Sequence, residues 1–181
     1  MVANHNSHAD GVTLMTSVPV DRLAITYPVA AEDYFGKSKL STFLSWFLIN
    51  LLLIPRKRDD KNPKRDPIFI LDSYLKNGKS LIFFPEGSRG KAGKIQVFKK
   101  GLGHLMKENM NIPIIPVYLE GIGRVLPKGN KIMLPGITKI YFGNPIFLEN
   151  ESVEEIVEKA ENAVHDLKNT CDNNNSSKLR E

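Results

Sequence analysis

The chain has 181 residues, of which 41% are hydrophobic and 25% charged, and this balance predicts one folded domain rather than a disordered or fibrous chain. Lys and Arg outnumber Asp and Glu by 25 to 20, and the net charge of +5 favours anionic partners such as phosphates or a lipid surface. The single cysteine, Cys171, excludes an internal disulfide and fits a reducing compartment. It lies in a polar stretch, so we do not interpret it as a nucleophile.

Short apolar runs alternate with helix-like segments along the chain, which is typical of an α/β layer architecture. The expected strands are Met1–Ala3, Leu23–Tyr27, Leu51–Ile54, Ser80–Phe84, Ile112–Leu119 and Lys139–Phe142. The expected helices are His8–Ser17, Leu40–Ile49, Pro67–Asn77, Lys99–Glu108 and Val153–Lys168. Several strands are continuous Ile, Val, Leu or Phe runs, as in sheets buried on both faces. We therefore predict a single α/β domain with a mixed, mostly parallel sheet flanked by helices.

Local signals mark the ends of two helices and of the domain. Ser152 with Glu155 three residues later predicts a capping box at the start of the last helix. Asn77-Gly78 predicts the end of the helix before the fourth strand. The segment Cys171–Glu181 is rich in Asn, Ser and Lys, so we predict a disordered tail after a domain of residues 1–170.

The longest apolar stretch, Leu40–Pro55, is interrupted by Ser, Thr and Asn and is shorter than the roughly 20 residues of a spanning helix. Its aromatic residues suit a lipid interface, although core packing is favoured because the helix has little basic, polar surface. Nor does the sequence after Met1 resemble a secretory signal.

The first chemical motif is Asn4-His5-Asn6-Ser7-His8-Ala9-Asp10, which joins the first strand to the first helix. His5 would lie on the turn, and Asp10 in the first helical turn could bind one imidazole nitrogen. That contact fixes the tautomer and leaves the other nitrogen to accept a proton. The pair therefore predicts a general base oriented by a carboxylate.

Two other interpretations of this motif stay open. Ser7 and Asp10 also form a helix-capping pattern, which explains both residues but gives no reason for His5. Alternatively, His5, His8 and Asp10 could bind a metal, but a zinc site needs a further ligand, and the remaining histidines lie in helical segments without ligand spacing. We therefore expect no metal and a solvent-facing His8.

The second motif is Phe84–Gly90, where an apolar strand ends at a proline. Gly87 permits a tight loop whose amides can approach a ligand, and Arg89 can bind phosphate with two hydrogen bonds. Glu86 would orient Arg89 or accept a hydrogen bond from a substrate hydroxyl. An ordinary turn with a surface ion pair is equally consistent with the segment alone. Four lysines that follow raise the local positive potential: Lys91, Lys94, Lys99 and Lys100.

Two further segments carry weaker signals. The cluster Arg56-Lys57-Arg58 predicts either a solvated face or a contact to phosphate or anionic lipid. Nucleic acid is a less attractive partner, because the basic residues are not interleaved with aromatic ones. The prolines of Ile112–Val117 predict an edge strand or an irregular ladder, and a core strand is favoured over an acyl-chain groove.

The motifs together resemble those of the glycerophospholipid acyltransferases, typified by 1-acylglycerol-3-phosphate acyltransferase. The Asn4–Asp10 motif resembles their first block, Leu53–Arg56 the second, Phe84–Arg89 the third and Ile112–Val117 the fourth, in the family's order and over residues 1 to about 145. Departures are Gly90 in place of the usual serine and the missing leading glycine of the second block.

The resemblance implies direct acyl transfer without an acyl-enzyme. His5 would take the proton of an acceptor hydroxyl while that oxygen attacks an acyl thioester, and Asp10 would hold His5. The resemblance places the acceptor phosphate near Arg56, Glu86, Gly87, Ser88 and Arg89. The acceptor would be a lysophospholipid, 1-acylglycerol-3-phosphate, and the product phosphatidate. The donor would be acyl-CoA or acyl-ACP, a co-substrate rather than a cofactor.

The family also implies peripheral attachment to the cytoplasmic side of a membrane. A catalytic turn only a few residues after Met1 leaves little room for its preceding strand, so we expect a domain that lacks an N-terminal membrane-docking segment. Alternative functions are a catalytically inert lipid-surface binding domain, an acyltransferase for another lyso-acceptor, and a metal-dependent hydrolase.

Overall fold

The computed structural model describes residues 1–35, 50–56, 62–125 and 134–178. It divides into two compact units, one of Met1–Asp10 with Phe84–Glu181 and one of Gly11–Phe83. The helix expected at Leu40–Ile49 lies outside the described residues. So do Lys57 and Arg58 of the basic cluster.

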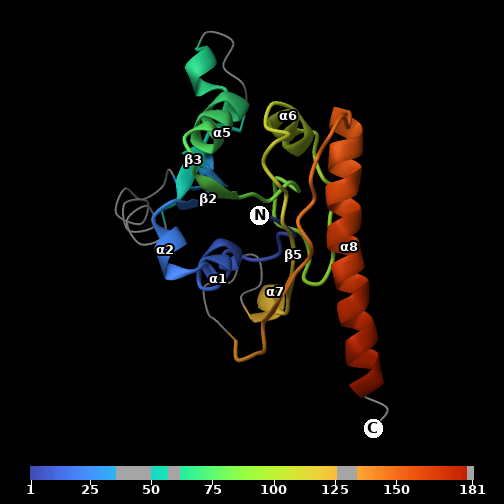
Figure 1. The fold of residues 1–181 in the computed structure, drawn as a ribbon. Helices are drawn as coiled ribbons and strands as arrows, with labels where there is room; N and C mark the ends of the chain where they lie inside the picture. Colours follow the sequence, from blue (N-terminus) through green and yellow to red (C-terminus); the bar gives the residue numbers. More distant parts are fainter. Residues whose placement is uncertain (36–49, 57–61, 126–133, 179–181) are drawn as a thin grey trace. The chain divides into compact units, whose positions relative to one another are not determined.

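The first unit contains a three-stranded sheet in the order β1-β5-β6. The short strand β1 (Val2–Ala3) runs parallel to the central strand β5 (Pro116–Glu120), which pairs antiparallel with β6 (Lys139–Phe142). The helices α6 (Gly101–Lys107) and α8 (Val153–Lys178) pack against each other, and α8 also packs against β5 (Figure 1). The short helix α7 (Ile122–Val125) follows β5 directly.

The second unit contains an all-parallel sheet in the order β3-β2-β4. Its strands are β2 (Thr26–Ala31), β3 (Leu52–Ile54) and β4 (Ser80–Ile82). Its helical segments are α1 (Asp10–Met15), whose first residue belongs to the first unit, α2 (Val20–Leu23), α3 (Glu32–Phe35), the 3-10 helix η1 (Pro63–Arg65) and α5 (Pro67–Lys76).

The helix α5 shows how local sequence sets an element's ends. The Asp66 carboxylate accepts the Ile68 N–H at 2.8 Å, and proline occupies the first helical position. At the other end Gly78 has φ +70°, and the Lys79 N–H donates to the Tyr74 carbonyl, which closes the helix as predicted. Strand β4 can therefore begin only two residues later.

The expected α/β class with mostly parallel strands flanked by helices is confirmed. Three of the four described strand pairings are parallel. The four pairings together form two sheets, one in each unit. The expected strand at Leu23–Tyr27 starts later, at Thr26, because Val20–Leu23 is helical.

Only the last two residues of the run Ile112–Val117 belong to a strand, β5, which is a core strand, as favoured from the sequence, and not an edge strand. Strand β5 is central, and Pro116 is its first residue, where a missing N–H costs no interior ladder bond. Ile114 precedes the strand and pairs with Ile146 in an isolated antiparallel bridge. Ile114, Val117 and Leu119 are buried.

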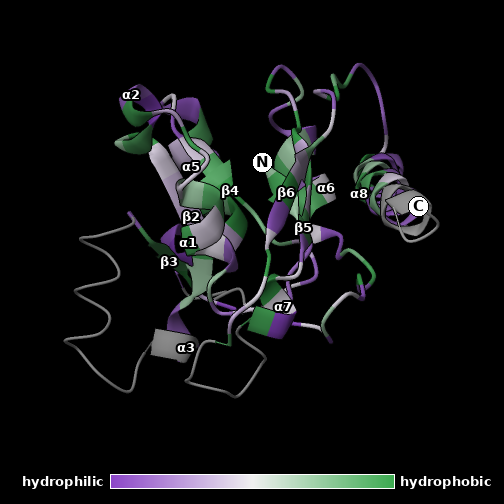
Figure 2. Ribbon diagram, turned by 90° about the horizontal axis from the view of Figure 1, so that it is seen from below, coloured by the Kyte–Doolittle hydropathy of each residue, from purple (hydrophilic) through white to green (hydrophobic). Residues whose placement is uncertain are grey.

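The predicted capping box at the start of α8 is present, because the Ser152 N–H donates to Glu155 Oε2 at 2.7 Å and the Glu155 N–H donates to Ser152 Oγ at 3.3 Å. The prediction of a disordered tail from Cys171 was wrong for the part that the structure describes. Helix α8 continues to Lys178, and Cys171 is buried. Val164 is also buried, and Cys171 follows it by two helical turns, so both lie on the same face of α8. Figure 2 shows that α8 contains both hydrophilic and hydrophobic residues.

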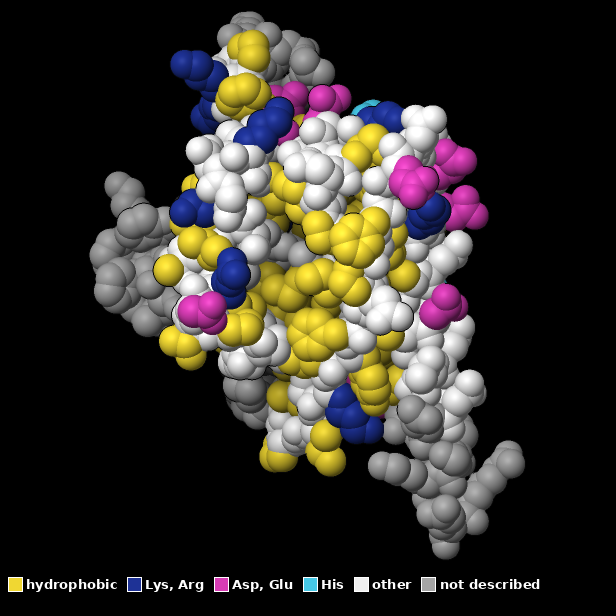
Figure 3. Space-filling model, in the orientation of Figure 1, with side chains coloured by type: hydrophobic (Ala, Val, Ile, Leu, Met, Phe, Trp, Pro, Cys, Tyr) yellow, Lys and Arg dark blue, Asp and Glu magenta, His cyan; other side chains and the backbone are white. Residues whose placement is uncertain are grey.

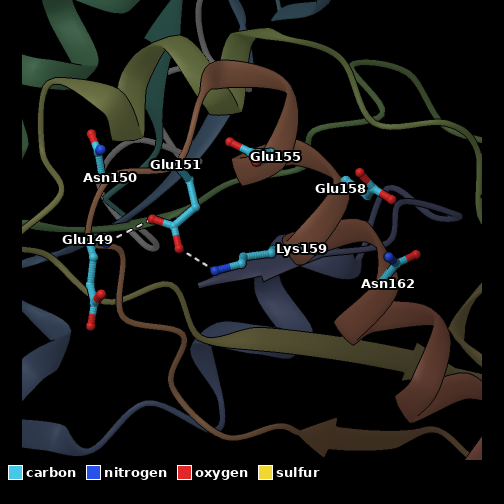
Figure 4. A pocket seen from close by; sticks show the side chains of 7 residues that line it. All are labelled: Glu149, Asn150, Glu151, Glu155, Glu158, Lys159 and Asn162. Carbon is cyan, nitrogen blue, oxygen red and sulfur yellow. Dashed lines mark hydrogen bonds and ion pairs between the residues drawn. The ribbon is translucent and has the colours of Figure 1, made fainter.

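Acidic side chains gather at the N-terminal part of α8 (Figure 3). They line an open hollow of about 490 Å³, where Lys159 forms an ion pair with Glu151 (Figure 4). The lining residues are Glu149, Asn150, Glu151, Glu155, Glu158, Lys159 and Asn162. Because carboxylates repel anions, this hollow does not suit a phosphate.

Candidate active site

The turn between β1 and α1 is organised around one oxygen atom of Asp10. Asp10 Oδ2 lies 2.8 Å from His5 Nδ1 and accepts the backbone N–H groups of Asn6 at 2.7 Å and Ser7 at 2.8 Å. The Asp10 side chain has 0% exposure. An ionised carboxylate only accepts hydrogen bonds, so His5 Nδ1 carries the proton in this contact. The predicted pairing of His5 with Asp10 is therefore present.

The orientation of His5 suits a proton acceptor. With Nδ1 donating to Asp10, Nε2 is the ring nitrogen that can accept a proton. The ring stacks on Phe84 with centroids 4.4 Å apart and an interplanar angle of 23°, and its side chain is 22% exposed. Phe84 therefore covers one face of the imidazole and Asp10 binds one edge, while the rest of the ring is exposed to solvent.

The capping interpretation and the catalytic interpretation describe the same structure. Ser7 Oγ accepts the Ala9 N–H at 3.2 Å, and Asp10 accepts the Ser7 N–H in return, as in a helix cap. The carboxylate that caps the helix is also the group that orients His5. The cap and the contact with His5 are therefore compatible in one structure.

Two buried asparagines, for which the sequence suggested no role, fix the turn in place. Asn4 accepts the Leu119 N–H at 2.7 Å and donates to the Leu119 carbonyl at 3.1 Å, so it imitates a strand pairing with β5. The Asn6 amide donates to the carbonyls of Lys91 and Lys94 at 2.8 and 2.9 Å. In the sequence, the only signal for these asparagines is that a polar residue follows the end of a strand. That signal does not predict which distant backbone groups they bind.

The loop at Phe84–Gly90 binds the backbone of His5 on both sides. Glu86 Oε1 accepts the His5 N–H at 2.9 Å, and the Gly90 N–H donates to the His5 carbonyl at 2.8 Å. Glu86 is only 2% exposed. Burial raises the pKa of Glu86, and the hydrogen bonds from His5 and Gln96 partly oppose that rise.

The oxygens of Glu86 accept hydrogen bonds from His5 and from Gln96. The expected roles, to orient Arg89 or to accept a hydrogen bond from a substrate hydroxyl, stay predictions. Gln96 Nε2 donates to Glu86 Oε2 at 2.9 Å and to the Ser88 carbonyl at 2.8 Å. No motif pointed to Gln96, because the chain must fold back over ten residues to bring it there.

The outer part of the same loop reaches the surface. Gly87 and Ser88 are exposed, and Arg89 is half-buried. Gly87 has φ +68°, a conformation that favours glycine. The pKa of His8 is lowered first by burial and then by the charges of Arg89 and His5, with Asp10 opposing them, so Arg89 lies within electrostatic reach of the histidine turn. His8 is exposed, as predicted.

Arg56 belongs to the other unit, two residues after β3. Its Nε donates to Asp33 Oδ1 at 2.9 Å and to Oδ2 at 2.7 Å, and both side chains are about half exposed. The first unit therefore brings together His5, Asp10 and the Glu86 loop, whereas Arg56 is held separately by its pair with Asp33.

A second hollow of the first unit, of about 240 Å³, borders the turn at Asn6 and is lined by residues of both charges. The other lining residues are Ala92, Gly93, Tyr118, Glu120, Gly121, Gly123, Arg124, Lys168 and Asp172. Over the described ranges, no three or more His, Cys, Asp or Glu residues are grouped so that they could hold a metal ion. Within the same ranges, every helix is too short or too polar to cross a membrane.

In this α/β fold, a histidine that a buried carboxylate orients lies beside a loop with glycine, serine and arginine, and this combination suits proton transfer. The chain belongs to the acyltransferase family, whose sequence profile, described as Acyltransferase, matches residues 1–120.

Among its relatives is the chloroplastic 1-acyl-sn-glycerol-3-phosphate acyltransferase BAT2 of Brassica napus, 28% identical over 151 residues, which are 81% of this chain and 40% of the relative. Another relative is the chloroplastic 1-acyl-sn-glycerol-3-phosphate acyltransferase LPAT1 of Arabidopsis thaliana. It is 28% identical over 150 residues, which are 80% of this chain and 38% of the relative. The chain thus spans about two fifths of these relatives. The crystal structure of the 1-acyl-sn-glycerophosphate acyltransferase PlsC from Thermotoga maritima shares the fold, with a TM-score of 0.64 at 23% identity over 93% of this chain and 64% of that one.

Proposed function

We propose that this protein transfers a fatty acyl group from an acyl thioester to the free hydroxyl of 1-acylglycerol-3-phosphate, which gives phosphatidate. The observation that carries the proposal is the 2.8 Å contact of His5 Nδ1 with the buried Asp10 carboxylate, which leaves Nε2 to accept a proton. The names of the relatives support the choice of reaction and acceptor.

The residues support a direct transfer. Nε2 of His5 takes the hydroxyl proton as the acceptor oxygen forms a bond to the thioester carbonyl carbon. The carbon–sulfur bond then breaks, and the departing thiolate takes the proton from the imidazolium. Asp10 stabilises the imidazolium while it exists, because its negative charge is buried against Nδ1.

The described nucleophiles fit a mechanism without an acyl-enzyme. Cys171 is buried in α8, and burial raises the pKa of its thiol. Ser7 is the hydroxyl nearest to His5 in the sequence, but it is buried and accepts the Ala9 N–H. Neither group is presented as a nucleophile beside His5.

The exposed part of the Glu86 loop is the proposed site for the acceptor phosphate. Gly87 and Ser88 would offer surface backbone and hydroxyl groups, and Arg89 would contribute a guanidinium group. Arg56 is proposed as a further phosphate contact. Glu86 would act through His5, by holding the turn, rather than by touching the substrate.

Acyl-CoA or acyl-ACP is the proposed donor, and no metal or prosthetic group takes part in this scheme. We also propose peripheral attachment to the cytoplasmic face of a membrane, since the acceptor and the product are lipids and the net charge of +5 favours an anionic surface.

Replacement of His5 by alanine tests the function. Loss of a general base costs about 10²–10⁴-fold in rate, so we expect His5→Ala to lose transfer from both acyl-CoA and acyl-ACP while its circular dichroism spectrum is unchanged. His8→Ala is the matched control, because His8 is exposed in the same turn. Near-normal turnover by His5→Ala would disprove the mechanism, and liposome binding by the unaltered protein without transfer from either donor would favour the inert binding domain.

A further inference from the structure

The side chain of Lys99 lies over the exposed glycine of the Glu86 loop. A Cβ atom added to Gly87 would lie 2.8 Å from Lys99 Nζ and 3.2 Å from both Cδ and Cε, so the ammonium end of the lysine occupies the space that glycine leaves open. We propose that Lys99 is a further binding residue for the acceptor's phosphate, which this loop and Lys99 would hold between them. This inference rests on the proposed function.

The backbone brings Lys99 to this position. The Lys99 N–H donates to the Pro85 carbonyl at 2.9 Å, so the start of the lysine side chain is anchored to the same loop that it covers. Gly87 contributes by its conformation, φ +68°, and by its missing side chain. Any larger residue at position 87 would have to displace the lysine and would be strained itself.

Within the described part of the chain, the positive charge of Lys99 is available to a ligand. Lys99 is exposed and forms no ion pair among the described residues, whereas the next residue, Lys100, binds Glu154 Oε1 at 2.6 Å. Two adjacent lysines therefore differ in what their ammonium groups can do. The ammonium group of Lys100 pairs with a residue of α8, whereas that of Lys99 is left to meet a ligand.

The loop that Lys99 covers is also hydrogen-bonded to His5, the proposed base. Glu86, which precedes Gly87, accepts the His5 N–H at 2.9 Å, so a phosphate bound at Lys99 and the outer loop would be attached to the element that positions His5. A phosphate monoester carries about −1.5 to −2 charges at pH 7, more than one cation neutralises. Arg89 and Lys99 together would supply two positive charges from one segment.

The test uses Lys99→Met, which keeps the aliphatic stem, with Lys100→Met as the matched control and Lys99→Arg as the charge-conserving variant. Binding of 1-acylglycerol-3-phosphate is measured by calorimetry in a His5→Ala background, so that no turnover interferes, and KM and kcat are measured in the otherwise unaltered protein. We expect Lys99→Met to weaken binding and raise the acceptor KM about 10-fold or more, since a hydrogen bond to a charged group is lost. The donor KM and kcat should stay within about twofold.

Lys100→Met should change acceptor binding by less than about twofold, because its ammonium already pairs at the surface. Lys99→Arg should retain most of the affinity. Equal behaviour of Lys99→Met and Lys100→Met would overturn the proposal, and so would an unaltered protein that binds no 1-acylglycerol-3-phosphate. Because calorimetry needs no turnover, a Lys99-dependent affinity would stand even if the transfer reaction proved to be different.

Discussion

The candidate site has a buried half and an exposed half, and the two are built differently. In the buried half, Asp10 and Glu86 are 0% and 2% exposed and accept hydrogen bonds from the His5 turn. In the exposed half, Gly87, Ser88 and Lys99 reach solvent.

This difference follows from what each half must do. A base works only in one orientation, and buried carboxylates that accept several hydrogen bonds hold an orientation well because an alternative would leave a charge unpaired in low dielectric. A phosphate arrives from water, so its cations must be reachable, and exposed pairs contribute little to stability. We therefore expect substitutions in the buried half to lower kcat and stability, and those in the exposed half to raise the acceptor KM.

The largest effect in this comparison is expected for Asp10→Asn. A neutral amide oxygen is a weaker acceptor for the three hydrogen bonds that one carboxylate oxygen receives, and the amide nitrogen, if turned toward His5 Nδ1, would favour the other tautomer. We expect kcat to fall by about 10²–10⁴-fold and the free energy of unfolding by about 1–3 kcal/mol. Steady-state kinetics and urea unfolding measure the two quantities. A variant with normal kcat would show that burial of Asp10 serves only the helix cap.

A smaller effect is expected for Glu86→Ala, which removes the acceptor of the His5 N–H. If Glu86 acts by positioning His5, kcat should fall about 10-fold while the acceptor KM changes little. Glu86→Gln should recover part of the loss, because its oxygen can still accept the His5 N–H. Gln96→Ala should produce a milder version of the same change, since it removes the second partner of Glu86. A rise in acceptor KM without a change in kcat would instead place Glu86 in contact with the substrate.

The smallest effect is expected for Arg56→Met, at the exposed residue of the second unit that we propose as a further phosphate contact. Its pair with Asp33 is about half exposed, so the free energy of unfolding should change by at most about 1 kcal/mol. If Arg56 binds phosphate, the acceptor KM should rise a few-fold, and added salt should weaken acceptor binding less than in the unaltered protein. Arg22→Met is a suitable control, because Arg22 is also exposed and paired with an aspartate, Asp21. Identical KM values for the two variants would remove Arg56 from the site.

The amino-acid sequence by itself determined the local parts of this protein. The contact between His5 and Asp10 spans five residues, the capping box of α8 spans three, and the glycine end of α5 lies within one turn. The backbone geometry of a turn or helix end allows few other partners at such spacings, and residue type then decides the contact.

Only the tertiary structure decided the rest. Glu86 meets His5 across 81 residues and Asn4 meets Leu119 across 115, and many polar residues could have satisfied those backbone groups equally well. Gln96, Lys99 and the buried Cys171 gained their positions in the same way, from how the loop and α8 pack. Sequence spacing predicted the contact between His5 and Asp10 because that pair is local. The residues that hold the pair come from distant segments, and only the folded chain brings them together.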